Sequence, residues 1–169
     1  MVATSTLRAL LVTAIALAGG MAGWHGVANA ATRFAGPTSS QTLALTAGDE
    51  LLAVANPDNN SVTIFDVRNN VNLKIAEVQV QSEPNGIAFL PDGSKLYVAN
   101  TVSGTVTVLT NPGGAGWSSI QHIAVGTEPY GLALTPNGKK LYVSNARSNT
   151  ISVIDTATDT VTKTIAVTD

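Results

Sequence analysis

The chain has 169 residues, of which 44% are hydrophobic and 12% charged, and its formal net charge at pH 7 is −2. This composition excludes a disordered chain and offers no basic surface for binding nucleic acid. The absence of cysteine excludes disulfides, iron–sulfur clusters, covalently attached c-type haem and thiolate zinc sites.

Residues 1–30 are typical of a cleaved signal peptide. A single cation, Arg8, precedes an apolar run from Ala9 to Leu17, and the small residues at 28–30 fit a signal-peptidase site. The apolar run is shorter than the roughly 20 residues that span a bilayer, which favours cleavage over an uncleaved anchor. We therefore expect a helix over residues 7–17, cleavage after Ala30, no membrane attachment of the mature chain, and a periplasmic, extracellular or cell-surface location.

Residues 31–169 consist of repeats. The tripeptide Val98-Ala99-Asn100 returns 45 residues later as Val143-Ser144-Asn145, and Val54-Ala55-Asn56 precedes it by 44 residues. A second run follows each tripeptide, reading "SVTIFD", "TVTVLT" and "TISVID" in turn. A period of this length predicts three supersecondary units, over about 41–81, 82–126 and 127–169, that bury their faces against one another.

Each unit has the pattern of β-strands throughout. In the second unit, four runs rich in Val, Ile, Tyr and Thr are separated by turn residues, at 86–90, 95–100, 105–110 and 118–125. The sequences Pro-Asp-Gly and Pro-Asn-Gly predict the first hairpin turns of the second and third units. Each unit is therefore predicted to be a four-stranded antiparallel meander, with "GIAFL" and "GLALT" as the innermost strands.

Four short strands that recur every 40 to 50 residues are typical of a β-propeller blade. A β-sandwich built from the same hairpins and a β-solenoid are the competing folds, although solenoid coils are shorter. We predict an all-β fold, a β-propeller of four-stranded antiparallel blades with about three blades present and an incomplete ring.

The third unit carries a family resemblance. Its run "LYVSNARSNTISVIDTATDTVTKTIAV" at residues 141–167 resembles the YVTN-type β-propeller repeat, and so does "LYVAN" followed by "GTVTVLT" in the second unit. The first unit departs from the pattern, since it reads "LAVAN" without the tyrosine. The resemblance implies an exported bacterial or archaeal propeller of the YncE-like or lactonase-like kind. Related propellers include lactonase-like enzymes, haem d1 domains and quinone-linked amine dehydrogenases, so the fold does not choose between a binding protein and an enzyme.

One face of the predicted ring is chemically richer than the other. In a meander, the loops between strands 2 and 3 and the loops between successive blades lie on the same face. These loops carry carboxylates, amides, a phenol and a guanidinium, which are the groups that recognise small ligands. The candidate ligand-binding residues are Asp58, Glu83, Asn85, Glu128, Tyr130 and Arg147.

Structural roles compete with binding at the recurring positions. Asn56, Asn100 and Asn145 end the second strand of each unit, which favours side chains that cap their own turns. Glu83 and Glu128 also recur, which favours a hydrogen bond at a blade junction over a catalytic carboxylate. Calcium binding at Asp58 is disfavoured because its neighbours lack the acidic spacing of a calcium loop.

No catalytic residue, metal site or cofactor is predicted. His122 is the only histidine after residue 30, and its repeat equivalents, Glu77 and Thr164, indicate a solvated position on an outer strand. The sequence has no serine or cysteine triad pattern, phosphate-binding loop or dinucleotide-binding fingerprint. Trp117 is expected to cover a blade edge rather than to stack on a ligand.

Three units are fewer than the four to eight or so blades of closed propellers. We expect either a truncated reading frame or a homodimer that closes a six-bladed ring. The favoured function is an exported, noncatalytic propeller that serves as a binding or scaffold module for a protein, glycan or small molecule. The alternatives are a fragment of a propeller enzyme, either a lactonase-like hydrolase or a haem d1-like or amine-dehydrogenase-like oxidoreductase, and a structural remnant without its own activity.

Overall fold

The computed structural model describes residues 42–114 and 116–167. The predicted helix at 7–17 and the cleavage site after Ala30 lie outside the described residues. No helix within them has the length and apolar character needed to cross a bilayer.

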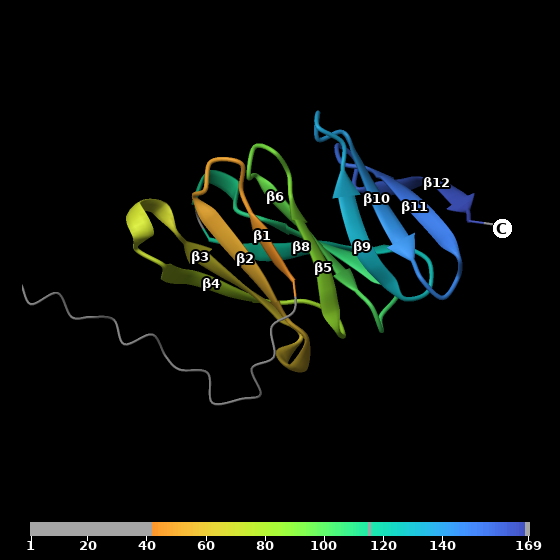
Figure 1. Ribbon diagram of the computed structural model, residues 1–169, viewed down its shortest axis with the longest axis horizontal. Helices are drawn as coiled ribbons and strands as arrows, with labels where there is room; N and C mark the ends of the chain where they lie inside the picture. The colour runs from red at the N-terminus through yellow and green to blue at the C-terminus, as the bar shows by residue number, and fades with distance from the viewer. Residues whose placement is uncertain (1–41, 115, 168–169) are drawn as a thin grey trace, which may run out of the picture. The chain divides into compact units, whose positions relative to one another are not determined.

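The described residues form three four-stranded antiparallel sheets that follow one another along the chain (Figure 1). The first blade contains β1 (Leu43–Leu45), β2 (Leu51–Asn56), β3 (Ser61–Asp66) and β4 (Leu73–Gln79). The second blade contains β5 (Pro84–Phe89), β6 (Lys95–Asn100), β7 (Thr105–Thr110) and β8 (Ser118–Ala124). The third blade contains β9 (Pro129–Leu134), β10 (Lys140–Asn145), β11 (Thr150–Asp155) and β12 (Thr160–Ala166). The predicted all-β propeller with three blades in an open ring is confirmed.

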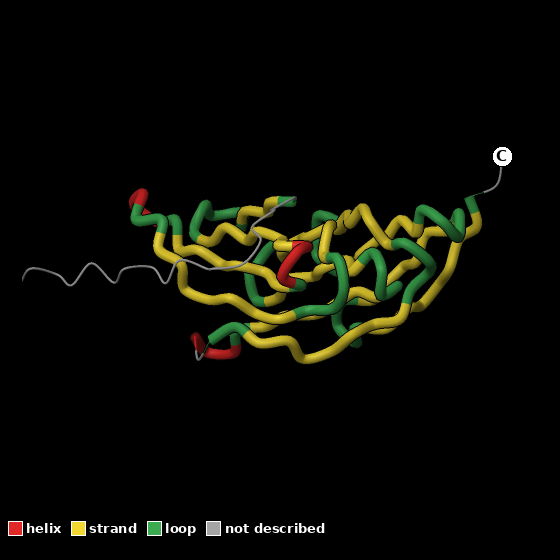
Figure 2. Tube along the Cα trace, turned by 90° about the horizontal axis from the view of Figure 1, so that it is seen from below, coloured by secondary structure: helices red, strands yellow, loops and turns green. Residues whose placement is uncertain are grey.

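Three short 3₁₀ turns, η1 (Pro57–Asn59), η2 (Arg68–Asn70) and η3 (Pro112–Gly114), lie between strands (Figure 2). The predicted hairpin turns are present, because Gly93 and Gly138 have φ values of 70° and 67° after their Pro-Asp and Pro-Asn pairs. Both residues stand in the left-handed region, which glycine enters without a steric penalty.

The first strands of the blades lie innermost, as predicted, and β5 contacts both β1 and β9. Gly86 in β5 permits this approach, because a Cβ atom there would stand 2.0 Å from the carbonyl oxygen of Tyr130 in β9. The apolar core lies between the sheets. One cluster joins the first and second blades, and a second cluster joins the second and third.

Each side of a blade faces one neighbour, because successive side chains of a strand point to opposite faces. We call the side that faces the next blade the forward face. In the second blade it consists of Tyr97, Val106, Val108 and Ile123, which pack against Leu141, Val143 and Ile154 of the third blade.

The recurring asparagines have a structural role, but their side chains do not bond within the turns that they precede. The amide nitrogen of Asn100 donates to Thr105 Oγ1 at 3.0 Å and to Thr107 Oγ1 at 2.8 Å, both on the following strand. Asn56 and Asn145 bond the equivalent hydroxyls of β3 and β11. The side chains therefore tie the second strand to the third in every blade.

Candidate functional site

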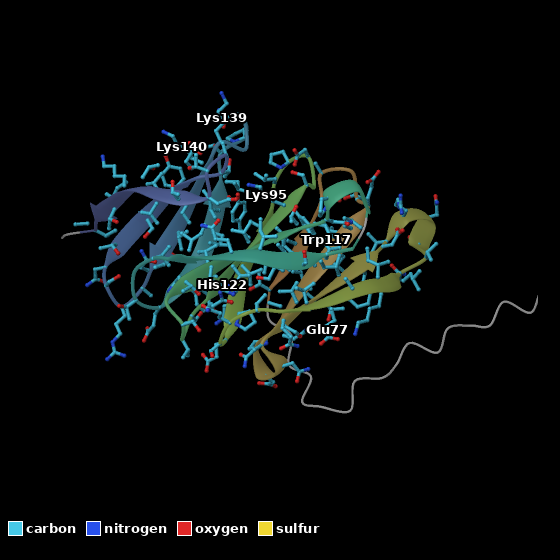
Figure 3. The ribbon with its side chains drawn as sticks, turned by 180° about the vertical axis from the view of Figure 1, so that it is seen from behind. Glu77, Lys95, Trp117, His122, Lys139 and Lys140 are labelled. Carbon is cyan, nitrogen blue, oxygen red and sulfur yellow. The ribbon has the colours of Figure 1, made fainter. Side chains whose placement is uncertain are left out.

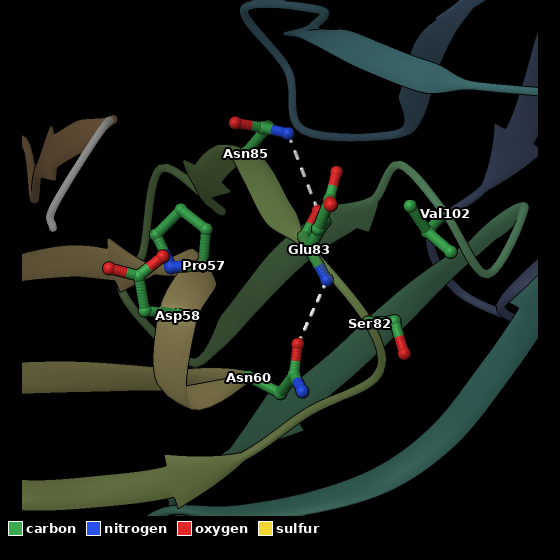
Figure 4. Close-up of a pocket in the computed structure, with 7 residues that line it drawn as sticks. All are labelled: Pro57, Asp58, Asn60, Ser82, Glu83, Asn85 and Val102. Atoms are coloured by element: carbon green, nitrogen blue, oxygen red, sulfur yellow. Dashed lines mark hydrogen bonds between the residues drawn. The ribbon is translucent and has the colours of Figure 1, made fainter. Parts of the chain in front are cut away.

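A pocket of about 470 Å³ lies at the junction of the first and second blades (Figure 4). Its lining comes from the β2–β3 loop, the segment that leads into β5, and the β6–β7 loop. The residues are Pro57, Asp58, Asn60, Ser82, Glu83, Asn85 and Val102. Loops between second and third strands thus meet the inter-blade loop on one face, as the meander pattern predicts.

Two residues of the pocket have left-handed backbone conformations. Asn60 has a φ of 51° and Glu83 a φ of 53°. Asparagine tolerates this region, whereas for glutamate it is uncommon and must be held by its surroundings. The Asn60 Oδ1 accepts the backbone N–H of Glu83 at 2.9 Å, and Glu128 has the same φ of 53°. A blade-junction hydrogen bond therefore exists at Glu83, but the main chain makes it and not the carboxylate.

The amide of Asn85 has a defined orientation. The Thr101 hydroxyl donates its proton to the carbonyl of Pro129 at 3.0 Å, so it accepts from Asn85 Nδ2 at 2.7 Å. Asn85 is only 6% exposed, and its other amide atom, Oδ1, is buried without a hydrogen-bond partner in the described residues. An acceptor left in this state costs about 1–3 kcal/mol.

The six candidate residues fall into two groups. Asp58, Glu83 and Asn85 line the pocket together. Arg147, Glu128 and Tyr130 lie at the next junction and do not line it. The Arg147 guanidinium is 3.2 Å from the Glu128 carboxylate in an exposed ion pair, and Tyr130 is 54% exposed.

The second junction differs because its loop residues differ. Val102 and Gly104 stand in the second blade where Asp58 and Asn60 stand in the first. Gly104 has no side chain to receive the N–H of Glu128, so the hydrogen bond that holds Glu83 has no counterpart there. The loops at the two junctions therefore supply different acceptor groups.

The charge of the pocket is negative. Its seven lining residues include two carboxylates and no cation. The described residues contain no group of three or more histidine, cysteine, aspartate or glutamate side chains that could hold a metal. The site therefore offers hydrogen-bond acceptors and negative charge.

Two aromatic residues that the sequence singled out lie away from the pocket (Figure 3). His122 is exposed on the outer strand β8, with its Nδ1 2.9 Å from Thr107 Oγ1. Trp117 is 9% exposed and packs edge-to-face on Phe89, with ring centroids 5.9 Å apart. Trp117 therefore belongs to the core between the first two blades.

Comparison with known proteins agrees with the sheet topology. Residues 71–168 match the family model of the YNCE-like beta-propeller. The chain belongs to this family. No curated protein matches this YNCE-like chain in sequence.

Solved structures similar to this YNCE-like chain are considerably longer. The hydrazine synthase of Kuenenia stuttgartiensis is 29% identical, with a TM-score of 0.72 over 85% of this chain and 40% of that one. A candidate 6-phosphogluconolactonase of Bacteroides fragilis is 23% identical, with a TM-score of 0.69 over 77% and 40%. Its counterpart from Bacteroides uniformis is 19% identical, with a TM-score of 0.69 over 77% and 41%. The last two likenesses show the fold alone, and the chain spans about two fifths of these structures.

Sequence reasoning did not select Asn60, Ser82 or Val102 as site residues. Asn60 looks like a turn former, and Ser82 and Val102 have no distinctive chemistry. The available signal was positional, since all three stand beside the selected Asp58 and Glu83 or at a repeat equivalent of Asp58.

Proposed function

We propose that this YNCE-like chain is an exported, noncatalytic binding module whose pocket at the first blade junction binds a cationic hydrogen-bond donor. A guanidinium or primary amine group of a small ligand has the required chemistry. The observation that carries the proposal is the buried and unpartnered Oδ1 of Asn85 in a pocket that contains two carboxylates.

The polarity of the pocket supports a donor as the ligand. Carboxylates accept hydrogen bonds and do not donate them when ionised, and Asn85 Oδ1 is also an acceptor. Hydrogen bonds to charged groups are shorter and stronger than those between neutral groups. A ligand with several N–H groups and a positive charge therefore satisfies the lining better than a neutral or anionic one.

Titration calorimetry at low ionic strength tests the proposal, with agmatine as the cationic donor and methyl glucoside as a neutral donor. We expect agmatine to bind with a Kd on the order of 1 mM, or about −4 kcal/mol. Added salt should weaken the binding because both carboxylates are accessible to solvent ions. Stronger binding of methyl glucoside than of agmatine would contradict the assignment.

The repeat provides a matched pair of variants. Glu83→Gln removes a pocket carboxylate, whereas Glu128→Gln removes its equivalent at the second junction, where Val102 and Gly104 replace Asp58 and Asn60. We expect agmatine affinity to fall about fivefold or more in the first variant, from the loss of a charge-assisted hydrogen bond. Equal effects of the two substitutions would place binding elsewhere.

Export is the second part of the proposal, and the signal-peptide pattern of residues 1–30 supports it. Mass spectrometry of the mature protein recovered from the cell exterior or periplasm is expected to find Ala31 at the amino terminus. Mature protein that retains Met1 and stays with the membrane fraction would contradict it.

A second candidate function is that of a segment of a propeller enzyme. The likeness to two candidate 6-phosphogluconolactonases favours it, as does the fact that the chain spans only about two fifths of their length. An assay of lactone hydrolysis with 6-phosphogluconolactone separates the two functions. We expect no rate above that of buffer, whereas turnover by the purified chain would favour the enzyme.

A further inference from the structure

Glu83 and Glu128 have matching backbone surroundings. Both have a φ of 53°. The carbonyl of Glu83 accepts the N–H of Thr101 at 2.9 Å, and the carbonyl of Glu128 accepts the N–H of Ala146 at 2.9 Å. Thr101 and Ala146 are themselves repeat equivalents. The second and third blades therefore each present a glutamate from the same place in the repeat.

The two carboxylates differ in their partners. Arg147 in the β10–β11 loop, 19 residues after Glu128, has its Nη1 3.2 Å from the Glu128 carboxylate. The repeat equivalent of Arg147 in the second blade is Val102, at the same separation from Glu83. A valine side chain cannot pair with a carboxylate. The second blade thus keeps the acid of this pair and lacks the guanidinium.

No other side chain of the described residues replaces the missing partner. The main-chain groups of Glu83 are occupied, since its N–H donates to Asn60 Oδ1 and its carbonyl accepts from Thr101 and Asn85. Its carboxylate makes no hydrogen bond or ion pair within residues 42–114 and 116–167. The side chain of Glu83 is therefore available to a bound molecule.

The pocket at the first blade junction has space for such a molecule. Glu83 and Val102 both line it, and its volume of about 470 Å³ lies within the range of small-ligand sites, which begins at roughly 300 Å³. Val102 is 65% exposed, and Figure 4 shows it on one side of Glu83 with Pro57 on the other. An aliphatic chain beside the Glu83 carboxylate would thus have apolar surface to lie on.

The remaining lining favours a guanidinium over an ammonium head group. Asp58, from the first blade, adds a second carboxylate, and the lining contains no cation. Asn85 lines the same pocket with a buried Oδ1 that has no partner among the described residues. A guanidinium is planar and carries N–H groups on several sides, so it can bond acceptors that come from different blades at once. An ammonium is a compact, strongly hydrated point charge, which loses more hydration on binding.

We propose that the ligand of this pocket is an alkylguanidinium that binds Glu83 in the place that Arg147 takes at Glu128, with its aliphatic stem on Val102. The proposal rests on the proposed function and narrows its ligand from cationic donors in general to a guanidinium on an aliphatic stem. The third blade supplies within one chain the contact that the second blade receives from a bound molecule. An arginine side chain of a partner protein and a free alkylguanidine share this chemistry.

The contact in the third blade indicates the identity of the partner rather than a high affinity. Arg147 and Glu128 have side chains that are 74% and 43% exposed, and exposed ion pairs contribute little free energy. Glu83 has the pocket and Asp58 in addition, so a Kd on the order of 1 mM remains the expectation.

Titration calorimetry of the full chain with butylguanidinium and butylammonium tests the head group. We expect butylguanidinium to bind about fivefold or more tightly than butylammonium, because only the guanidinium can bond several acceptors in one plane. Equal affinities would overturn this proposal and leave the proposed function standing, whereas binding of neither ion would contradict the proposed function itself. Nα-acetylarginine amide separates the two sources. Tighter binding of this probe than of butylguanidinium would identify a protein chain as the ligand, and weaker binding would identify a free small molecule.

Substitution of Val102 tests the place of the guanidinium. Val102→Arg supplies the group within the chain, and we expect the affinity for butylguanidinium to fall about 10-fold or more, because the ligand must displace a tethered competitor. Val102→Lys is the matched control, since it adds the same charge without the planar fork, and it should weaken binding less than about threefold. Equal losses in the two variants would show that charge alone is recognised, and the proposal would fail. Urea unfolding checks that both variants fold.

The reverse substitution keeps the proposal falsifiable if the Val102 variants do not fold. Arg147→Val leaves the Glu128 carboxylate without its guanidinium, as Glu83 is in the wild type. We expect butylguanidinium to shift the NMR signal of the Glu128 backbone amide more in this variant than in the wild type. An equal shift in both proteins would show that Arg147 does not hold the place of the ligand, and would overturn the proposal.

Discussion

The Tyr97 hydroxyl donates a hydrogen bond of 2.6 Å to the Asp159 carboxylate, across the boundary between two blades and across 62 residues of sequence. Lys95 holds the other oxygen of the same carboxylate at 2.6 Å. Tyr97 is fully buried and Asp159 nearly so. The Asp159 carboxylate is thus a buried polar contact within an apolar junction that other hydrogen bonds also cross, such as the one from Gln121 Nε2 to the Asp159 carbonyl.

Stability at high pH should depend on Tyr97. Burial, followed by the hydrogen bond to Asp159 and the charge of that carboxylate, raises the pKa of Tyr97 above its ordinary value near 10. The unfolded chain then loses the phenol proton first, so this contribution to stability is complete below about pH 10 and falls as the pH rises further. We expect the free energy of unfolding to fall by up to about 1.4 kcal/mol per pH unit from this group.

Urea unfolding between pH 8 and 11 measures this slope. Tyr97→Phe should cost about 1.5–3 kcal/mol at pH 8, from the lost hydrogen bond to a charged group, and should flatten the alkaline slope. Tyr142→Phe makes the same chemical change one blade further on and is the matched control. Parallel slopes for the wild type and Tyr97→Phe would show that this phenol does not cause the alkaline loss.

Lys95 should contribute more to stability than its repeat equivalent, Lys140. Lys95→Met leaves the Asp159 carboxylate largely buried with the Tyr97 hydroxyl as its remaining side-chain partner, and breaking such a pair is strongly destabilising. Because the Lys95 side chain is 23% exposed, we expect a loss of about 2–3 kcal/mol, at the low end for buried pairs. Lys140→Met, at an exposed position, should change stability by less than about 0.5 kcal/mol. Thermal and urea unfolding of both variants provide the comparison, and equal losses would contradict a special role for the junction.

The local features of the fold could be predicted because their causes are local. Gly93 and Gly138 follow Pro-Asp and Pro-Asn, which predicts turns without knowledge of the rest of the chain. The alternating apolar residues of β6 and β10 predict strands in the same way. The repeat then extends each local prediction to three blades.

The junction contacts could not be predicted from one sequence. Asp159 lies in a segment that the sequence identifies only as a turn, and nothing near it indicates a partner 62 residues away. For the same reason, only part of the pocket lining could be predicted. Glu83 and Glu128 look alike in the sequence, but the side chain of Asn60, at a position where the next blade has Gly104, distinguishes their surroundings.

Asn60 should affect ligand binding more than folding. Asn60→Gly removes the hydrogen bond to the Glu83 N–H but places glycine at a φ of 51°, where it relieves backbone strain. We expect stability to change by less than about 1 kcal/mol and agmatine affinity to fall, because Glu83 is no longer held. Asn60→Ala loses the same bond and keeps the unfavourable φ, so it should be less stable than Asn60→Gly by about 1 kcal/mol. Titration calorimetry measures the effect on agmatine affinity, and urea unfolding measures the effect on stability. Unchanged affinity in Asn60→Gly would show that Asn60 does not contribute to ligand binding.

The close approach of the innermost strands should make Gly86 intolerant of any side chain. A Cβ atom there would stand 2.0 Å from the Tyr130 carbonyl oxygen and 3.2 Å from its carbon, both of them main-chain atoms that move only with β9. Gly131 is the repeat equivalent on the exposed side of the third blade, where a Cβ atom would meet Ser144 Oγ at 2.9 Å, a side-chain atom that can rotate away. Gly86→Ala should therefore cost about 3 kcal/mol or more, beyond the usual range for overpacking, and Gly131→Ala less than about 1 kcal/mol. Since both substitutions have the same effect on the unfolded chain, their difference in urea unfolding reports contact between blades, and equal losses would show that β5 and β9 are not packed at this distance.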